Sequence, residues 1–246
     1  PGVERQDQGL CRRQEGVLPD QGGAVRRFED LKLRLYHGSK AGIVGAIAPT
    51  SRSCCDFGRG FYMGSEPTQP MTLICRMEKP KFYTCEFDMT GLRVYRFEPT
   101  VDWAMFVAWN RGLMPEKYKD YYDKKFRPIA DGHDVIVGKI ANDRMVVVLD
   151  WFFNQFISDI GLLEALQALN LGDQYVCVTQ AACDRVKIVD EKTLSPLECE
   201  QQRMRAMHQR DLAIKAVNRI RLLHRRDGEA FFEIMERETG VKLYDA

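Results

Sequence analysis

A His-Gly-Ser turn directly follows an apolar, strand-like run in the segment LYHGS, residues 35–39. Side chains two positions apart on a strand point to the same face, so we expect His37 to share a face with Leu33 and Leu35. An imidazole at this place can be bonded into the core, lie at an exposed strand end, or bind a ligand. These five residues alone favour the core interpretation.

Two distant segments change that interpretation when they are compared with His37. The segment FGRGFYMGS, residues 57–65, brings Gly-x-Gly and an aromatic pair about 20 residues later. The segment DQYVCV, residues 173–178, opens a late strand with an acid and an amide before tyrosine. The three motifs, in this order, resemble the ADP-ribosyltransferase superfamily. The closest resemblance is to its poly-ADP-ribose-polymerase-like branch, which has an H-Y-E motif.

The resemblance covers about residues 31–192 and leaves both ends of the chain outside. Within the superfamily, CDFGRGFY at 55–62 and DVIVGKIANDR at 134–144 are most similar to uncharacterised bacterial domain families. The implied fold class is α+β, with split antiparallel β-sheets around an NAD cleft and helices inserted between the strands.

The resemblance implies that the first motif binds NAD. His37 would bond the hydroxyls of the adenosine ribose, and the backbone of Gly38 would pair with the nicotinamide amide. Glycine suits this position because, without Cβ, the backbone approaches a flat ring closely. Ser39 would add a hydroxyl contact.

The second motif would hold the other parts of NAD. Gly58 and Gly60 permit a bend, and Tyr62 matches the aromatic residue that packs on the nicotinamide ring. Arg59 is a candidate for the pyrophosphate, because a guanidinium matches phosphate oxygens. The structural alternative is that Phe61 and Tyr62 alternate on a half-buried strand and that one of them fills the core.

The third motif departs from the active polymerases, which carry glutamate where this chain has Gln174. That glutamate binds the nicotinamide ribose and stabilises positive charge as the glycosidic bond breaks. A charge pair at about 4 Å is worth about 4 kcal/mol at a dielectric near 20, so its loss would cost roughly a thousandfold in rate. His37, Tyr62 and Gln174 are nevertheless the predicted catalytic set, because Gln at this position fits the related bacterial families.

Two outcomes stay open at Gln174: slow transfer of a single ADP-ribose, or a silent module that binds NAD or a nucleotide, or contacts proteins. A third option is that another acidic residue takes the place of the missing glutamate. Asp173 points to the other strand face, whereas Asp134 and Asp143 flank a strand that would reach the site. Polymer synthesis needs the glutamate and an elongation site, and neither is identifiable, so the implied acceptor is a protein, nucleic acid or small molecule that takes one ADP-ribose.

A second departure concerns the aromatic expected near Leu73, where the segment QPMTLIC has none. Trp103 or Trp109 would then close the nicotinamide site from the other side. The structural alternative is that these tryptophans join a helix to the sheet. Transfer of an RNA 2′-phosphate, known in the same superfamily, uses paired histidines, and the other three histidines here lack site context.

The elements that must position these residues follow from periodicity. Strands are predicted where β-formers cluster, and PKFYTCEFDM and LRVYRFE, separated by TG, indicate a hairpin. Helices are predicted over 101–126, 143–157 and 161–169. Strands occur in pairs and clusters without regular β-α-β alternation, which favours α+β.

Three regions are predicted: a flexible tail at 1–27, the transferase-like domain at 28–195 and a helical extension at 196–246. Ser195 and Pro196 make a helix start. Residues 196–228 contain eight Lys and Arg residues and only four acidic residues. Ala213, Ala216, Val217, Ile220 and Leu223 recur at helical spacing, so one face would dock while a basic face at 203–226 stays solvated or, as the sharper alternative, binds nucleic acid.

Composition narrows the classes of protein. Lys plus Arg is 36 and Asp plus Glu is 35, so no global field favours nucleic acid or an acidic membrane surface. Apolar runs are too short to span a bilayer, and the N-terminal residues lack the pattern of a signal peptide. The eight cysteines show no metal-ligand spacing and several lie in apolar runs. We therefore expect no metal, no membrane partner and a reducing, cytoplasmic compartment.

Overall fold

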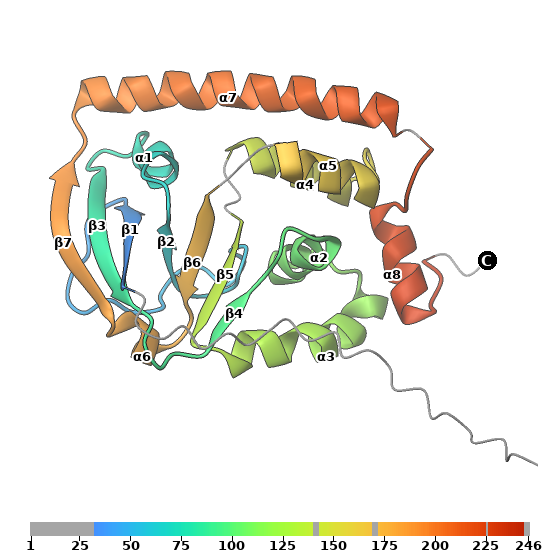
Figure 1. The fold of residues 1–246 in the computed structure, drawn as a ribbon, viewed down its shortest axis with the longest axis horizontal. Helices are drawn as coiled ribbons and strands as arrows, with labels where there is room; N and C mark the ends of the chain where they lie inside the picture. The colour runs from blue at the N-terminus through green and yellow to red at the C-terminus, as the bar shows by residue number, and fades with distance from the viewer. Residues whose placement is uncertain (1–31, 140–142, 169–171, 225, 244–246) are drawn as a thin grey trace, which may run out of the picture.

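The computed structural model describes residues 32–139, 143–168, 172–224 and 226–243, which form one seven-stranded sheet with helices around it (Figure 1). In spatial order the strands are β4 (Val94–Arg96), β5 (Val135–Lys139), β6 (Asp173–Cys177), β2 (Phe61–Gly64), β1 (Lys32–Ser39), β3 (Lys81–Asp88) and β7 (Val186–Thr193). The helices are α1 (Thr68–Ile74), α2 (Val101–Asn110), α3 (Glu116–Gly132), α4 (Asp143–Phe153), α5 (Asp159–Ala168), α6 (Gln180–Cys183), α7 (Pro196–Leu223) and α8 (Phe231–Thr239). The α+β class is confirmed.

The predicted pair of separate antiparallel sheets is wrong. The strands form a single sheet in which β4 and β5 run parallel. The pairing between β1 and β2 is nevertheless very short. β1 pairs with β3 along the whole of Lys32–Ser39, but with β2 only through Tyr36 and Gly64. The β2-facing edge of β1 is therefore open beyond Tyr36.

The predicted hairpin of β3 and β4 is also wrong. Antiparallel partners occupy both edges of β3, with β1 on one side and β7 on the other. The chain does turn after β3, where the amide of Leu92 donates to the carbonyl of Met89 at 3.1 Å. The three-residue β4 then pairs with β5, because two eight-residue neighbours have already taken the hydrogen-bonding edges of β3.

Alternation along the central strands sorts their side chains between two cores. Val135 and Val137 of β5 enter the core that contains Tyr175 and Cys177 of β6. Ile136 and Val176 enter the other core, which the helices cover. Gln174 lies two residues before Val176, so it points to the helix-covered face.

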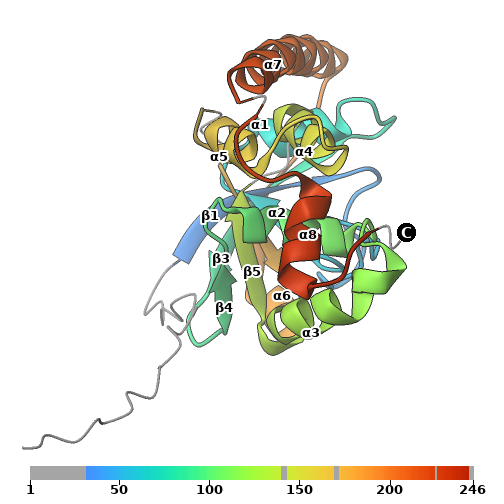
Figure 2. The same ribbon diagram turned by 90° about the vertical axis from the view of Figure 1, so that its right-hand side faces the viewer.

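The C-terminal helices are part of the main core. Helix α7 crosses one side of the molecule, with α1, α4 and α5 between it and the sheet, and α8 descends beside α3 (Figures 1 and 2). The core that contains α2 and α3 also buries five residues of α7 and α8: Val217, Ile220, Phe231, Ile234 and Met235. The region predicted as an extension therefore shares its hydrophobic core with the sheet.

The start of α7 follows the prediction closely. The hydroxyl of Ser195 accepts from the amide of Glu198, and the Glu198 carboxylate accepts from the amide of Ser195, which forms a capping box before Pro196. Ala213, like Val217 and Ile220, is buried as expected, but Leu223 is exposed. By Leu223 the helix is leaving the core, since it ends at that residue.

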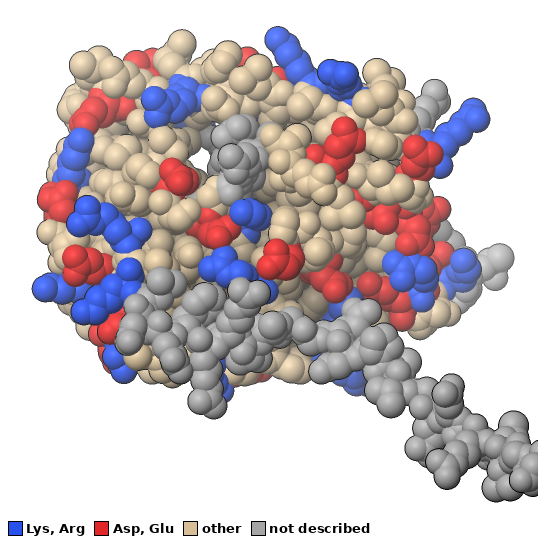
Figure 3. All heavy atoms as spheres, viewed as in Figure 1, with Lys and Arg blue, Asp and Glu red and all other residues tan. Residues whose placement is uncertain are grey.

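Charges of both signs are interspersed over the face seen in Figure 3, in keeping with the nearly balanced composition. Among the described helices, none combines the length and apolar character that crossing a bilayer requires. The predicted tail at 1–27 lies outside the described residues.

Candidate functional site

A cavity of about 380 Å³ opens where the pairing between β1 and β2 ends. His37 and Gly38 of β1, Tyr62 of β2 and Gln174 of β6 all line it, so the structure brings the three sequence motifs together. We call this space the sheet cavity. Ten further residues complete its lining: Tyr36, Arg52, Cys54, Cys55, Asp56, Met63, Gln69, Pro70, Leu73 and Arg111.

A second space of about 510 Å³ adjoins the sheet cavity, because His37, Gly38 and Tyr62 line both. Ser39 and Gly60 face this second space. The hydroxyl of Ser39 donates to the carbonyl of Gly42 at 3.0 Å and accepts from its amide at 3.1 Å. That hydroxyl therefore already has partners in its own turn.

His37 presents a hydrogen-bond acceptor at the cleft. Its ring stacks on Phe61 with centroids 4.3 Å apart, and its Nδ1 lies 2.7 Å from the carbonyl oxygen of Tyr62. A carbonyl oxygen only accepts, so Nδ1 carries the proton. Burial lowers the pKa of His37, although the bond to Tyr62 opposes this. The ring is thus neutral near pH 7, and Nε2 is left as an acceptor.

Tyr62 contributes its ring to the cavity wall, while its hydroxyl holds the preceding loop. The hydroxyl donates to the carbonyl of Gly58 at 2.6 Å and accepts from the amide of Phe57 at 3.1 Å. Burial, as the main cause, raises the pKa of Tyr62 far above its usual range. The hydroxyl is therefore a neutral structural group, and the ring is what a ligand meets.

Gln174 is buried, with 6% of its surface exposed, and its Nε2 has no hydrogen-bond partner among the described residues. Its cross-strand neighbours are Gly64 on β2 and Gly138 on β5, which carry no side chains to cover it. A buried donor without a partner costs about 1–3 kcal/mol. An unpaired amide that lines a cavity is the feature expected of a group that bonds a ligand.

Glycine is required at two places in the wall of the second space, one of which, Gly38, also lines the sheet cavity. A Cβ on Gly60 would lie 2.4 Å from Cγ1 of Val176 and 2.9 Å from the carbonyl oxygen of Cys177, because β2 enters directly beside β6. A Cβ on Gly38 would lie 2.7 Å from the carbonyl oxygen of Pro70 in α1. Gly38 thus serves the packing of α1 as well as the open edge of β1.

The structure places Arg59 outside both cavities, with its side chain exposed. The guanidinium groups that line the sheet cavity belong to Arg52 and Arg111. Arg111 lies at the C-terminal end of α2 and bonds Asp56, which lines the cavity too. Sequence reasoning missed Asp56 and Arg111, since 55 residues separate them and neither belongs to a recognisable spacing.

The other acids considered at the site lie elsewhere. Asp173 points away from Gln174 and accepts from Arg96 at 2.8 Å and from Lys139 at 2.9 Å. Asp134 lies at the opposite end of β5 and accepts from Arg93. The side chain of Asp143 lies outside the described residues.

Of the three residues predicted around the nicotinamide ring, only Leu73 lies at the sheet cavity, and Trp103 and Trp109 do not. Leu73 does line the sheet cavity and is 59% exposed. Trp103 is fully buried over Gly138, and Trp109 donates from Nε1 to Asp123 at 2.7 Å. Trp103 joins helix to sheet as the structural alternative expects, whereas Trp109 packs on Phe126 and so joins α2 to α3.

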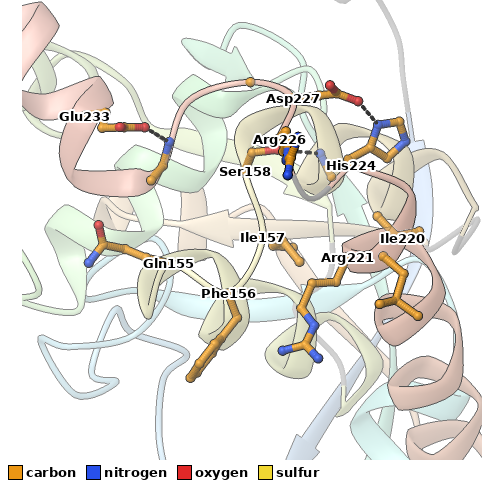
Figure 4. Close-up of a pocket in the computed structure, with 14 residues that line it drawn as sticks. Gln155, Phe156, Ile157, Ser158, Ile220, Arg221, His224, Arg226, Asp227 and Glu233 are labelled. Atoms are coloured by element: carbon orange, nitrogen blue, oxygen red, sulfur yellow. Dashed lines mark hydrogen bonds and ion pairs between the residues drawn. The ribbon is translucent and has the colours of Figure 1, made fainter.

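A larger cavity, of about 620 Å³, lies between the loop after α4, the C-terminal end of α7 and the N-terminal end of α8 (Figure 4). We call it the helix cavity. His224 contacts Asp227 at 3.3 Å and Glu164 at 2.5 Å. The Glu233 carboxylate accepts from the amide of Ala230 at 2.7 Å. The imidazole of His224 and the carboxylates of Asp227 and Glu233 thus already have partners within the protein.

Across the described ranges, no three His, Cys, Asp or Glu side chains are grouped so that they would hold a metal ion. The cysteines there, from Cys54 to Cys199, are free thiols.

Comparison with known proteins gives one match. A family model described as "Protein of unknown function (DUF3990)" matches residues 33–188, which include His37, Tyr62 and Gln174 and end before α7. No curated protein and no solved structure matched the chain. Since the match spans well over half of the 246 residues, the chain belongs to the DUF3990 family.

Proposed function

We propose that this protein cleaves NAD and transfers one ADP-ribose to an acceptor, with release of nicotinamide, on an ADP-ribosyltransferase-type fold. The observation that carries the proposal is the unpaired amide of Gln174, buried in the same cavity as His37 and Tyr62. Three motifs far apart in the sequence meet there, and this supports the roles that the resemblance implies for them. A ligand rich in hydroxyl and amide groups would complete the hydrogen bonding of this cavity.

On this proposal, β1 binds NAD through two kinds of group. Nε2 of His37 accepts a hydrogen bond from a ribose hydroxyl, since Nδ1 already donates to Tyr62. The open edge of β1 at Gly38 offers backbone groups to the nicotinamide amide. The ring of Tyr62 gives the nicotinamide a flat apolar wall.

Gln174 would act on the nicotinamide ribose. Its Oε1 accepts from a ribose hydroxyl, and its Nε2 donates to a ligand oxygen. As the bond between the nicotinamide nitrogen and ribose C1′ breaks, its electron pair leaves with nicotinamide and positive charge develops on the ribose. A neutral amide stabilises that charge less than a carboxylate does, so slow turnover is expected.

A second candidate is NAD binding without cleavage. The observation that favours it is that His37 and Gln174, which face the ligand site, are both uncharged near pH 7. NAD would then raise the thermal stability of the protein without any release of nicotinamide.

The test is nicotinamide release from NAD by purified protein, with variants at two histidines. His133 is the matched control for His37, because its Nδ1 also contacts a backbone carbonyl, that of Ile129 at 3.0 Å, away from the cavity. We expect release to fall at least a hundredfold in His37→Ala and to stay near the wild-type rate in His133→Ala.

Gln174→Glu separates the two candidates. An active wild type supports transfer, whereas a wild type that binds NAD silently and gains activity in Gln174→Glu supports the binding module. A wild type that neither binds nor cleaves NAD contradicts both.

The acceptor class includes nucleic acid as a further proposal. Helix α7 carries the predicted basic face and packs on α1, whose Gln69, Pro70 and Leu73 line the sheet cavity. Figure 3 shows Lys and Arg side chains along the edge of the molecule where α7 runs. Binding of DNA or RNA would weaken steeply with salt, and affinity that is absent or insensitive to salt would contradict it.

A further inference from the structure

The pair of Asp56 and Arg111 leaves one carboxylate oxygen without a protein partner. Nε and Nη2 of Arg111 both approach Oδ1 of Asp56 at 2.8 Å. Oδ2 has no hydrogen-bond partner among the described residues and is not sealed from solvent. Asp56 lines the sheet cavity, so a ligand there is within reach of a carboxylate that has an oxygen to spare.

The loop that carries Asp56 is held in place against the catalytic motifs. The next residue, Phe57, is buried and donates its amide to the hydroxyl of Tyr62. Arg111 fixes the carboxylate from the other side, because it caps the end of α2. Asp56 therefore has a defined position in the loop that the hydroxyl of Tyr62 holds.

We infer that Asp56 is the proton acceptor of the transfer reaction, and that the group it deprotonates is a neutral hydroxyl. This inference rests on the proposed function of the same cavity. It gives the site an anionic group, which Gln174 does not supply.

The hydroxyl oxygen of the acceptor bonds to ribose C1′ while the bond from C1′ to the nicotinamide nitrogen breaks. That bond's electron pair leaves with nicotinamide, which departs neutral. The proton of the hydroxyl passes to Oδ2 of Asp56 and then to solvent. No oxidant or metal is needed.

The charges of the cavity favour a neutral acceptor. Arg52 and Arg111 line the cavity together with the single carboxylate of Asp56. A lysine or guanidinium acceptor would meet two like charges there, whereas a hydroxyl meets none. Water is the smallest acceptor of this class, so hydrolysis of NAD is a suitable probe reaction.

The protonation behaviour of Asp56 fits this role. Burial raises the pKa of its carboxyl above the usual value, and the charge and hydrogen bonds of Arg111 oppose that effect. A base whose pKa is closer to neutrality removes a proton more readily. The other titratable groups around it are Asp150, which contacts Arg111, and the cavity residues Tyr36, His37, Arg52, Cys54, Cys55 and Tyr62.

The experiment measures nicotinamide release from NAD in water by wild type, Asp56→Asn and Asp134→Asn. Asp134 is the matched control, because it is also an aspartate bonded by an arginine, Arg93, and it lies away from the cavity. We expect Asp56→Asn to lose about a hundredfold or more in rate. Its stabilisation by NAD in thermal unfolding should remain, and Asp134→Asn should keep the wild-type rate.

Formate added to Asp56→Ala tests the proton transfer itself, since a free carboxylate can replace the missing base. Restored release supports the inference, as does a wild-type rate that rises with pH through one ionisation. The pH profile needs no variant and holds even if Asp56→Asn fails to fold. Rates within threefold for Asp56→Asn and Asp134→Asn overturn the inference alone. A wild type that releases no nicotinamide overturns the proposed function and the inference with it.

Discussion

The sheet cavity and the helix cavity differ in how their polar groups are satisfied. The helix cavity is larger, about 620 Å³ against about 380 Å³, yet His224, Asp227 and Glu233 in its lining already have protein partners (Figure 4). In the sheet cavity, Nε2 of Gln174 and Oδ2 of Asp56 have none among the described residues. Unpaired polar atoms mark a ligand site better than volume does, because they record hydrogen bonds that the protein alone leaves unmade.

The largest expected effect comes from adding one methyl group to either of two glycines: Gly60, which faces the space adjoining the sheet cavity, and Gly161, which lines the helix cavity. In Gly60→Ala the new Cβ meets Cγ1 of Val176 at 2.4 Å, so β2 and β6 must separate. In Gly161→Ala the nearest atom, Cβ of Ile157, lies at 3.3 Å, so a shift of a few tenths of an ångström relieves the contact. We expect Gly60→Ala to lower the free energy of unfolding by about 2–4 kcal/mol and Gly161→Ala to change it by under about 1 kcal/mol.

Chemical denaturation of both variants measures this difference. Equal losses in the two variants would mean that the close contact of β2 and β6 does not shape the sheet cavity.

A smaller effect, with opposite signs in stability and binding, is expected at Gln174. Gln174→Met removes a buried amide that has no partner, so the free energy of unfolding should rise by about 1 kcal/mol. Affinity for NAD should fall at least tenfold. Gln202 is the matched control, because its Oε1 is also buried without a partner, in α7 and outside the cavity.

Denaturation and calorimetric titration of NAD follow these two quantities. Gln202→Met should gain stability with unchanged NAD affinity. A loss of stability in Gln174→Met would show that its amide is already satisfied.

The smallest effect concerns pH, and it has opposite signs at the two cavities. Burial lowers the pKa of His37, so its contribution to stability is lost as pH falls below about 6.5 toward the folded-state pKa. Glu164 and Asp227 raise the pKa of His224, so its contribution is present below about 6.5 and is lost as pH rises through the folded-state pKa.

Thermal unfolding of wild type, His37→Asn and His224→Gln between pH 5 and 8 separates the contributions of the two histidines to stability. The difference between wild type and His37→Asn should be larger at pH 8, and the difference between wild type and His224→Gln larger at pH 5. Differences that run in the same direction would contradict these assignments.

Local patterns in the sequence predict most of the elements but not their pairing. The start of α7 at Pro196 and the strand containing Gln174 lie where capping and periodicity place them. The helices predicted at 143–157 and 161–169 exist, with bounds of 143–153 and 159–168. The hairpin prediction fails because pairing is a competition between strands. Eight-residue partners take both edges of β3, and nothing within LRVYRFE reveals them.

The same limit applies to the candidate site. His37, Tyr62 and Gln174 are recognisable because each belongs to a motif beside a strand, and the sheet then brings them to one cavity. The pair of Asp56 and Arg111 joins a loop to the end of α2, so it depends on tertiary packing. Arg59 is predicted because it lies inside a motif, whereas Arg52, which no motif marks, is the arginine of this loop that lines the cavity.

The most direct test of the central claim is the NMR signal of the Gln174 side-chain amide during titration with NAD. Loss of one signal pair in Gln174→Met assigns it, and Gln155 in the helix cavity serves as the internal control. We predict that NAD shifts the Gln174 pair and slows its hydrogen exchange, and that the Gln155 pair stays unchanged. A Gln174 pair that is unaffected by saturating NAD would contradict the claim that NAD completes the hydrogen bonding of the sheet cavity.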